Sequence, residues 1–332
     1  MQPQSTDAKV ARLLSLAARH LETVDPNSVI GEYSSGAGVT PQFAENAPGS
    51  LSLLMVPGGH GSTPQDHVEG SIIAARTVVG THLGRDAQRW IDERTEPARA
   101  RSYHPHRNGG VFGSSFDRYG VAESVVGFDL SMGHIDSLVP ALHRLARTVL
   151  TMMPGFRPSF TMVRCGRSAG TQQVTFDIEQ ALPLTDLKPL MTELGIGNQH
   201  GSLMSSVAFL LGARFTLPAN TSQVTIRPIK GGVEMRLDVM LEAIQDPPPQ
   251  LLSLLRLLMT ERPRSLQTLD RWLSAFTLDG FPHAGDFTVL SVWVRPDVAA
   301  RVALYLRPAA LDESRVEHPA GSSSSSPWDA PS

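Results

Sequence analysis

Arginine side chains stand in phase on segments that the sequence predicts to be β-strands. Arg227 and Arg236 lie in the two alternating runs of a hairpin predicted over 221–242, and Arg301 lies in a third run, 301–307. Because successive side chains of a strand point to opposite faces, we expect these three guanidinium groups to share one inner face. Arg164 is a fourth candidate, whose facing the alternation leaves open. Convergent guanidinium groups bind phosphate oxygens in pairs, so the pattern predicts an anion site.

Carboxylates on the same predicted face allow a competing interpretation. Asp177, Glu234 and Asp238 alternate with aliphatic residues as the arginines do. Buried charges are usually paired, so the arginines and carboxylates can form a salt-bridged interior that binds nothing. In a catalytic site, Asp177 or Asp238 would position or deprotonate an acceptor as a general base.

Aromatic and hydroxyl side chains complete the predicted face. Trp293 and Tyr305 offer π-faces that stabilise a cation or stack on an aromatic ring, and Thr175, Thr225 and Ser291 are further candidates for binding substrate. An anion site beside an aromatic-lined apolar chamber is what the ionisation of an allylic diphosphate requires. The leaving group is then stabilised by positive charge while water is excluded from the carbocation.

Five strand pairs separated by helical segments must position these residues. The pairs are predicted at 51–56 with 67–75, 110–118 with 121–130, 159–165 with 172–178, 221–229 with 233–242, and 286–294 with 301–307. Residues 25–48 are expected to form a loop, with a short helix within it as an alternative. Helices are expected at the N-terminus, 86–94, 135–152, 184–194, 201–212, 250–259 and 265–276. Ten antiparallel strands lose their free edges by closing into a barrel. The predicted fold class is therefore α/β, with a ten-stranded antiparallel barrel inside a ring of helices.

Composition sets the remaining bounds. The 332 residues carry a formal net charge of −3 and no run of lysines and arginines, which argues against nucleic acid as a partner. The lone Cys165 excludes an internal disulfide and suits a reducing cytoplasm. No apolar run has the length that crosses a membrane, and the N-terminus lacks the apolar core of a signal peptide. We expect a single domain over 1–310 and a disordered Ser/Pro-rich tail over 311–332.

Three shorter motifs have weaker chemical interpretations. Gly166 to Gly170 matches G-x-S-x-G around Ser168, but a strand follows it, so a hairpin turn is expected in place of a nucleophile elbow. The Gly-rich stretch 58–63 lacks the lysine of a phosphate loop and is also expected to be a hairpin turn. His104 and His106 could supply two metal ligands, but no third is placed.

Three segments resemble the ABBA, or PT-barrel, aromatic prenyltransferases of the bacterial phenol and naphthalene type. They are QQVTFDIEQALPLTDLKPLMTELGI (172–196), QVTIRPIKGGVEMRLDVMLEAIQDP (223–247) and TVLSVWVRPDVAARVALYLRP (288–308). The resemblance implies transfer of a dimethylallyl or geranyl group from its diphosphate to an electron-rich aromatic acceptor in secondary metabolism. The alternatives are a non-catalytic small-molecule-binding barrel of the same fold and, more weakly, a hydrolase that uses Ser168.

The resemblance also implies roles for individual residues. Arg236 matches the diphosphate-binding arginine of these enzymes, Arg301 falls where they carry a basic residue, and Tyr305 matches a tyrosine of the aromatic-substrate pocket. Other positions depart from the pattern, since Thr171 falls near a diphosphate lysine and Arg227 stands where a tyrosine is expected. The resemblance implies no firm cofactor. Magnesium, where related enzymes use it, would be held near Asp66 or Glu69, but many of them need no metal.

Overall fold

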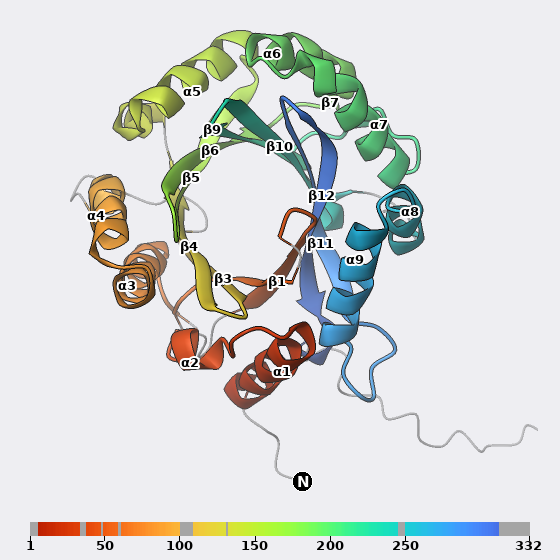
Figure 1. The fold of residues 1–332 in the computed structure, drawn as a ribbon. Helices are drawn as coiled ribbons and strands as arrows, with labels where there is room; N and C mark the ends of the chain where they lie inside the picture. The colour runs from red at the N-terminus through yellow and green to blue at the C-terminus, as the bar shows by residue number, and fades with distance from the viewer. Residues whose placement is uncertain are drawn as a thin grey trace, which may run out of the picture.

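A closed barrel of ten antiparallel strands forms the centre of the computed structural model (Figure 1). The structure describes residues 6–33, 38–47, 49–58, 61–99, 109–130, 132–244 and 250–311. Around the barrel the strands follow the order β1-β12-β11-β10-β9-β6-β5-β4-β3-β2, and β1 closes the ring by pairing with both β12 and β2. The strands are β1 (Val39–Ala44), β2 (Leu51–Met55), β3 (Gly110–Asp117), β4 (Gly120–Asp129), β5 (Phe156–Gly166), β6 (Gly170–Ile178), β9 (Ser222–Ile229), β10 (Gly232–Met240), β11 (Gly285–Arg295) and β12 (Val298–Pro308).

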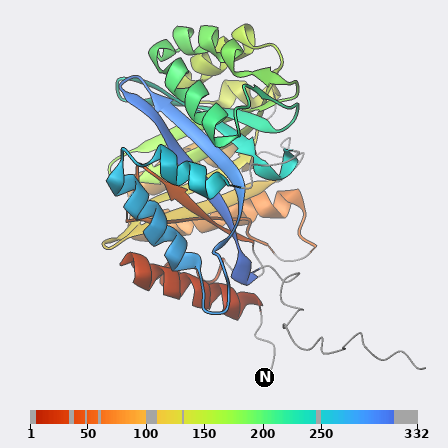
Figure 2. The ribbon, with the colours of Figure 1, turned by 90° about the vertical axis from the view of Figure 1, so that its right-hand side faces the viewer.

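Helices ring the barrel on its outside. They are α1 (Thr6–Leu21), α2 (Asn27–Ile30), α3 (Pro64–His82), α4 (Arg85–Arg99), α5 (Pro140–Met152), α6 (Leu187–Glu193), α7 (His200–Leu210), α8 (Leu251–Leu258) and α9 (Pro263–Phe276). Figure 2 shows α8 and α9 lying outside β11 and β12, as they do in Figure 1. Short 3₁₀ turns and a two-stranded sheet of β7 (Leu182–Pro183) and β8 (Thr216–Leu217) complete the shell.

Alternation along the strands decides which side chains face the helices. Val224, Ile226 and Leu237 are fully buried on the outer face of the β9–β10 hairpin, and α5 packs on β9 there. Such burial stabilises by about 1.5–3 kcal/mol for each large aliphatic side chain. The opposite phase of the same hairpin faces the lumen with charged residues, as the sequence predicts. The predicted barrel and its helix ring are confirmed.

One predicted strand pair is wrong. Residues 67–75 belong to helix α3, because Pro64 occupies its first turn and Thr63 and Asp66 form a reciprocal capping box at its N-terminus. Val68, Ile72 and Val79 then face the barrel at helical spacing. The expected hairpin turn at 58–63 is therefore wrong as well, since the stretch leads from β2 into a helix. Gly59 and His60 lie outside the described residues.

The tenth strand is β1, within a segment predicted to be a loop. Its Pro41 argues against a strand in the sequence, because proline cannot donate to a ladder. The structure accommodates Pro41 because β1 pairs with β12 only from Gln42 onward. Val39 to Gln42, which include Pro41, pair with β2 on the other side. The expected tail from 311 onward lies, apart from Leu311, outside the described residues. The division into a domain and a tail stays a prediction.

A buried ion pair outside the lumen ties the barrel to the helix ring. Glu45 follows β1, and its side chain is 0% exposed. Its carboxylate accepts hydrogen bonds from Arg262 Nη1 at 2.8 and 3.0 Å and from the Val302 backbone N–H at 2.7 Å. Arg262 precedes α9 and also donates to the Ala300 and Leu258 carbonyls. One carboxylate therefore joins β1, β12 and the start of α9.

The single cysteine of the chain is shielded from solvent. Cys165 of β5 points out of the lumen, is buried, and its thiol donates to the Ala87 carbonyl at 3.4 Å. Burial, with a smaller effect from the charge on Glu123, raises the pKa of Cys165 to about 12.

Across the described part of the chain, no helix combines the length and apolarity needed to span a bilayer.

Candidate active site

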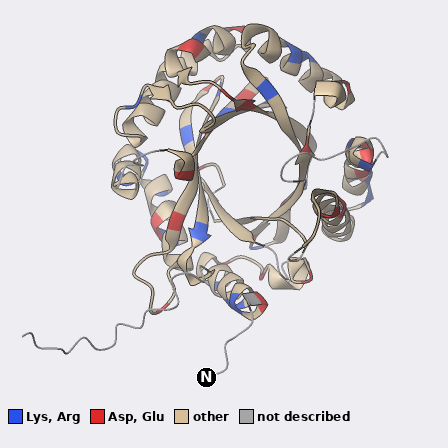
Figure 3. Cartoon of the chain, turned by 180° about the vertical axis from the view of Figure 1, so that it is seen from behind, with Lys and Arg blue, Asp and Glu red and all other residues tan. Residues whose placement is uncertain are grey.

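Two chambers of opposite charge divide the barrel lumen. The arginine chamber, about 130 Å³, is lined by residues that include Gln42, Asn46, Glu123, Arg164, Gln173, Arg227, Glu234, Arg236 and Trp293. The carboxylate chamber, about 240 Å³, is lined by residues that include Asp129, Phe160, Met162, Asp177, Gln223, Asp238 and Tyr305. Arg236 lines both, and Tyr305 also lines the narrow space between them. Charged residues lie on the barrel strands as well as on the helices in Figure 3.

Strand geometry places the two chambers toward opposite ends of the barrel. Glu123 and Asp129 both belong to β4 and line different chambers. Six residues of extended strand separate them, which corresponds to about 20 Å. The register of β4 with β5 sets Glu123 opposite Gly166 and Asp129 opposite Phe160. The lumen is therefore charged differently along its length, with Arg236 and Tyr305 at the junction.

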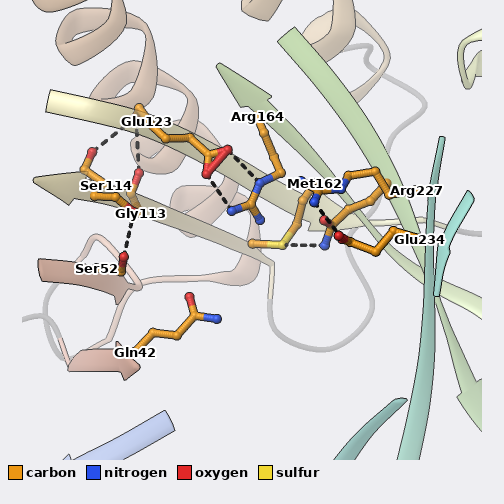
Figure 4. Close-up of polar contacts among 12 residues, drawn as sticks. Gln42, Ser52, Gly113, Ser114, Glu123, Met162, Arg164, Arg227 and Glu234 are labelled. Carbon is orange, nitrogen blue, oxygen red and sulfur yellow. Dashed lines mark hydrogen bonds and ion pairs between the residues drawn. The ribbon is translucent and has the colours of Figure 1, made fainter. Parts of the chain in front are cut away.

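Arg164 and Glu123 form a bidentate pair in the arginine chamber (Figure 4). Arg164 Nε and Nη2 donate to the two carboxylate oxygens at 2.9 and 2.7 Å. Burial opposes ionisation of Glu123, but the charges of Arg164 and Arg227 outweigh it and lower the pKa of Glu123. Burial likewise opposes the charge on Arg164, and Glu123 outweighs it and raises the pKa of Arg164. Both groups are therefore charged at neutral pH.

Arg227 shares its carboxylate with a second arginine. Its Nη2 lies 2.6 Å from Glu234 Oε1, while Arg295 Nε lies 2.7 Å from Oε2 (Figure 4 shows the first contact). The Arg295 guanidinium also stacks 4.8 Å from the ring centroid of Trp293. Burial, together with the charge of Arg164, lowers the pKa of Arg227 although Glu234 opposes this shift. Arg227 Nε is buried and has no hydrogen-bond partner within the described structure.

Arg236 sits at the junction of the chambers and is held by Asp238. Its Nε and Nη2 lie 3.0 and 2.9 Å from Asp238 Oδ2. The other oxygen accepts from the Ser291 hydroxyl, and Thr225 Oγ1 lies 3.4 Å from Oδ2. Burial would lower the pKa of Arg236, but the charge of Asp238 and its hydrogen bond to the guanidinium outweigh it and raise the pKa. Asp238 thus acts first as the counterion of Arg236.

Tyr305 connects the junction to β1. Its hydroxyl accepts a hydrogen bond of 3.1 Å from Gln42 Nε2. Burial raises the pKa of Tyr305, although the charge on Arg236 opposes the shift. The phenol is therefore neutral at pH 7 and presents its ring to the carboxylate chamber. Thr175 and Thr225 share a 2.8 Å hydrogen bond beside it, across the β6–β9 register.

The far end of the carboxylate chamber combines acids and an aromatic wall. Asp177 Oδ1 accepts a 2.8 Å hydrogen bond from Gln223 Nε2. Phe160 reaches over Gly127, where an added Cβ would lie 2.3 Å from a ring carbon. Glycine at 127 therefore lets the Phe160 ring occupy the lumen, since any larger residue would displace it.

Most of the predicted site residues face the lumen, but Arg301 does not join the other arginines. The lining of the two chambers includes Arg164, Arg227, Arg236, Asp177, Asp238, Thr175, Trp293 and Tyr305, and Thr225 and Ser291 bond to Asp238 there. Arg301 lines neither chamber, and its guanidinium donates to the Ala299 and Ala300 carbonyls at 3.4 and 3.3 Å. Trp293 and Tyr305 lie in different chambers, contrary to the expectation of one shared aromatic wall.

The other candidates lie away from the lumen. Asp66 caps helix α3, and Glu69 lies on the outer surface of the same helix, where it accepts from Gln65 at 3.1 Å. The magnesium candidates are therefore misplaced, because the segment is a helix outside the barrel. Ser168 lies in the β5–β6 turn, where the Gly166 N–H bonds to the Ala169 carbonyl at 3.0 Å, so the expected hairpin turn is confirmed. His104 and His106 lie outside the described residues.

Several lumen residues were not predicted. Glu123, Asp129, Phe160 and Met162 share the phase of the lumen-facing residues on β4 and β5, so alternation within the predicted strands was a usable signal. Gln42 was not predicted as a lumen residue, because the segment that forms β1 is predicted to be a loop. Arg295 was not predicted because the predicted strand ends at Val294, one residue before the end of β11.

Acidification should weaken the fold through the two lumen glutamates. The pKa of Glu234 is lowered, because Arg227 and Arg295 outweigh the opposing effect of burial, and the pKa of Glu123 is lowered as described above. A lowered folded-state pKa contributes stability above the unfolded value that is lost as the pH falls through the folded value. We expect the free energy of unfolding to fall below about pH 4.3, by up to about 1.4 kcal/mol per pH unit for each extra proton that the unfolded chain binds.

Urea unfolding at a series of pH values measures this slope. Glu234→Gln should make it shallower, while Glu179→Gln, in an exposed pair with Arg157, should leave it unchanged. An unchanged slope in Glu234→Gln would contradict the assignment.

Solved structures with similar folds place this architecture among known proteins. The 5-dimethylallyltryptophan synthase of Streptomyces coelicolor is 13% identical over 93% of this chain and 99% of its own, with a TM-score of 0.70. The 6-dimethylallyltryptophan synthase of Micromonospora olivasterospora, in complex with DMASPP and Trp, is 12% identical over 93% and 99%, also with a TM-score of 0.70. The prenyltransferase PriB, in a ternary complex with L-tryptophan and dimethylallyl thiolodiphosphate, is 13% identical over 92% and 97%, with a TM-score of 0.69.

These similarities define the fold of the chain. No model of a known protein family matches the sequence, and neither does any curated protein. The structure is a PT barrel, the fold of the ABBA aromatic prenyltransferases.

Proposed function

We propose that this chain is an aromatic prenyltransferase, which moves a dimethylallyl or geranyl group from its diphosphate to an electron-rich aromatic acceptor in secondary metabolism. The observation that carries the proposal is the convergence of Arg164, Arg227 and Arg236 inside a closed PT barrel, next to a chamber walled by Phe160 and Tyr305. Neighbours of the same fold bind dimethylallyl diphosphate analogues together with tryptophan. A cytoplasmic location is part of the proposal and fits the single, buried cysteine.

The charges in the arginine chamber suit a leaving diphosphate. Its lining carries three guanidinium groups (Arg164, Arg227 and Arg236) and two carboxylates (Glu123 and Glu234), which leaves an excess of one positive charge. The buried Nε of Arg227 is one donor that no group among the described residues uses. Fixed donors aimed at developing negative charge stabilise the transition state without reorganisation.

The reaction would proceed at the junction between the chambers. The bond between C1 of the prenyl group and the diphosphate oxygen breaks, and the electron pair leaves with the diphosphate toward the arginines. The allylic cation is attacked by an acceptor atom held beside Tyr305, a new bond to C1 forms, and the acceptor then loses a proton. Asp238 already neutralises Arg236, so Asp177, at the acceptor side, is the better placed base.

A second candidate function is a barrel that binds an anionic or aromatic small molecule without turnover. The observation that favours it is that Arg164, Arg227 and Arg236 each already pair with a carboxylate of the barrel. Incubation with dimethylallyl or geranyl diphosphate and a panel of naphthols, phenols and indoles, followed by mass spectrometry, separates the two candidates. Bound diphosphate without any prenylated product would favour the binding barrel, and no binding of either donor would contradict prenyl transfer.

Arg227→Met should weaken diphosphate binding about 10- to 100-fold, which is the loss expected for one or two charge-assisted hydrogen bonds. Glu234 keeps its contact with Arg295 in this variant, so the fold should survive. Calorimetric titration with inorganic pyrophosphate measures the change. Arg256→Met is the matched control, because Arg256 pairs with Asp270 on the exposed surface of α8 and α9. Equal affinities in the two variants would remove Arg227 from the site.

A further inference from the structure

The α1–α9 hollow, a space of about 460 Å³, lies outside the barrel between α1, the end of α9 and the segment 277–281 that follows α9. Helices α1 and α9 pack on each other outside the strands (Figures 1 and 2). None of the described residues that line the hollow lines either chamber of the lumen. Small-molecule sites usually have volumes of roughly 300–1,000 Å³. The hollow is therefore separate from the lumen and large enough for a small molecule.

One stripe of α1 forms a wall of the hollow. Its lining residues recur at intervals of three or four, as Lys9, Arg12, Leu16 and His20. This spacing aligns side chains on one face of a helix. Lys9 is half-buried and Arg12 is exposed, and neither has an ion-pair partner within the described ranges. The stripe therefore presents two cations at one end of the wall, with the apolar Leu16 beside them.

The apolar part of the lining includes side chains that the protein core does not use. Leu16 of α1 and Phe281, in the segment after α9, are half-buried. Among the described residues, neither belongs to the core cluster or to the side chains packed against it, whereas Leu278 does pack against that cluster. Ala275 and Ala310 extend the apolar lining. An apolar ligand would remove the exposed surface of Leu16 and Phe281 from water, which favours binding.

Hydrogen bonds of the protein fix the walls of the hollow. Arg271 of α9 donates through Nε and Nη2 to the His20 carbonyl, at 3.1 and 2.9 Å, and so ties the end of α1 to α9. The Phe281 N–H donates to the Leu278 carbonyl at 3.1 Å, closing a turn in which Gly280 has a φ of 90°. Because these bonds hold both walls, binding would require little further ordering of the protein.

The charge of the lining selects the sign of the ligand. Lys9 and Arg12 contribute two positive charges, and Asp279 contributes one negative charge. With His20 counted as neutral, one positive charge is in excess. A ligand with a single negative charge balances this excess, whereas an ammonium group would lie beside like charges.

We propose that the α1–α9 hollow binds a small monocarboxylate with an apolar body. Its carboxylate would lie beside Lys9 and Arg12, and its body would pack on Leu16 and Phe281. A carboxylate accepts charge-assisted hydrogen bonds from both an ammonium and a guanidinium group. This site goes beyond the proposed function, because it shares no described lining residue with the lumen chambers and does not depend on turnover there.

Three matched probes test the charge preference. They are 2-naphthylacetate, 2-naphthylethanol and 2-naphthylethylamine, which share a ring system but end in a carboxylate, a hydroxyl and an ammonium. Hydrogen exchange in α1 and in 277–281, followed by mass spectrometry as each probe is titrated into the full chain, measures occupancy of the hollow apart from the lumen. The carboxylate should bind about fivefold more tightly than the alcohol, as exposed ion pairs allow, and the amine should bind most weakly.

Two results of this titration would overturn the proposal. One is equal or tighter binding of the amine. The other is unchanged exchange in α1 and 277–281 with 2-naphthylacetate at millimolar concentration.

Variants separate the charge effect from the apolar one. Arg12→Met should weaken binding of 2-naphthylacetate about threefold and leave 2-naphthylethanol unchanged, while Phe281→Ser should weaken both. Arg12 and Phe281 lie outside the core cluster, so both variants should fold. Arg19→Met is the matched control, because Arg19 is exposed on the same helix and does not line the hollow, and it should change neither affinity. Equal losses for the carboxylate and the alcohol in Arg12→Met would contradict the proposal.

Two other outcomes would also overturn it. Slower exchange in β9 and β10, with unchanged exchange in α1, would place the probe in the lumen. Binding that appears only after Trp328→Gln, which removes the only tryptophan, tyrosine or phenylalanine of 312–332, would assign the hollow to this chain's own C-terminal segment.

Discussion

Replacing Arg236 with methionine is expected to lower kcat/KM for the allylic diphosphate by about 10²–10³-fold, the usual effect of removing one preorganised group that stabilises a transition-state charge. Arg236 lines both chambers, so in the proposed reaction its guanidinium would lie where the departing diphosphate and the incoming acceptor meet. The measurement is steady-state prenylation of whichever acceptor the panel identifies. A variant with undiminished kcat/KM would contradict the assignment of the junction as the reaction centre.

Stability must be measured beside activity for this variant. The change leaves Asp238 in the lumen with only neutral donors, Ser291 and Thr225, and breaking a buried pair from one side typically costs about 3–5 kcal/mol. The double variant Arg236→Met/Asp238→Asn removes both charges and should recover most of that loss in urea unfolding. It should remain inactive, because the diphosphate still lacks its donor. Recovery of activity together with stability would show that Arg236 is only structural.

Replacing Glu45 with alanine is expected to destabilise the fold by about 3–5 kcal/mol, because Arg262 and the Val302 N–H then lose their buried acceptor. The effect should be large although Glu45 lines neither chamber, since its carboxylate joins β1, β12 and the start of α9. Urea unfolding monitored by circular dichroism measures it.

Two comparisons make the Glu45 result specific. Glu45→Gln keeps an oxygen that can accept from Val302, so it should cost less than Glu45→Ala. Glu22→Ala removes an exposed carboxylate that pairs with Arg271 and should cost no more than about 1 kcal/mol. A loss in Glu45→Ala as small as that in Glu22→Ala would mean that the pair contributes little to closing the barrel.

The period-two alternation of aliphatic and polar residues predicted most of the fold, because a strand with one helix-covered face places these two residue types on opposite sides. It located the lumen-facing side of β9 and β10, and with it Arg227 and Arg236. The alternation failed for β1, where Pro41 argues against a strand. It also failed for α3, because residues 67–75 are predicted to be a strand. The capping box of Thr63 and Asp66 was the available signal for that helix.

The details of the site depend on register and side-chain direction, which alternation does not fix. Glu123 pairs with Arg164 only because β4 and β5 meet in a particular register. Arg301 shares the phase of Tyr305, yet its long side chain turns back to the backbone carbonyls of Ala299 and Ala300 at the start of β12. Alternation thus predicted that Arg227 and Arg236 face inward, but it left Arg164 open and was wrong for Arg301. The partners of each arginine required the structure.

The single thiol of this chain offers a measure of how often the barrel opens. Cys165 lies between β5 and α4 with a pKa of about 12, so it is both shielded and protonated at neutral pH in the closed state. Its reaction with a thiol reagent should therefore proceed through rare openings, and its rate should report their equilibrium population. If β5 must separate from α4 for the reagent to enter, a ligand that binds across the lumen strands should slow the labelling. One unmodified cysteine could then serve as a built-in gauge of ligand occupancy, without any engineered label.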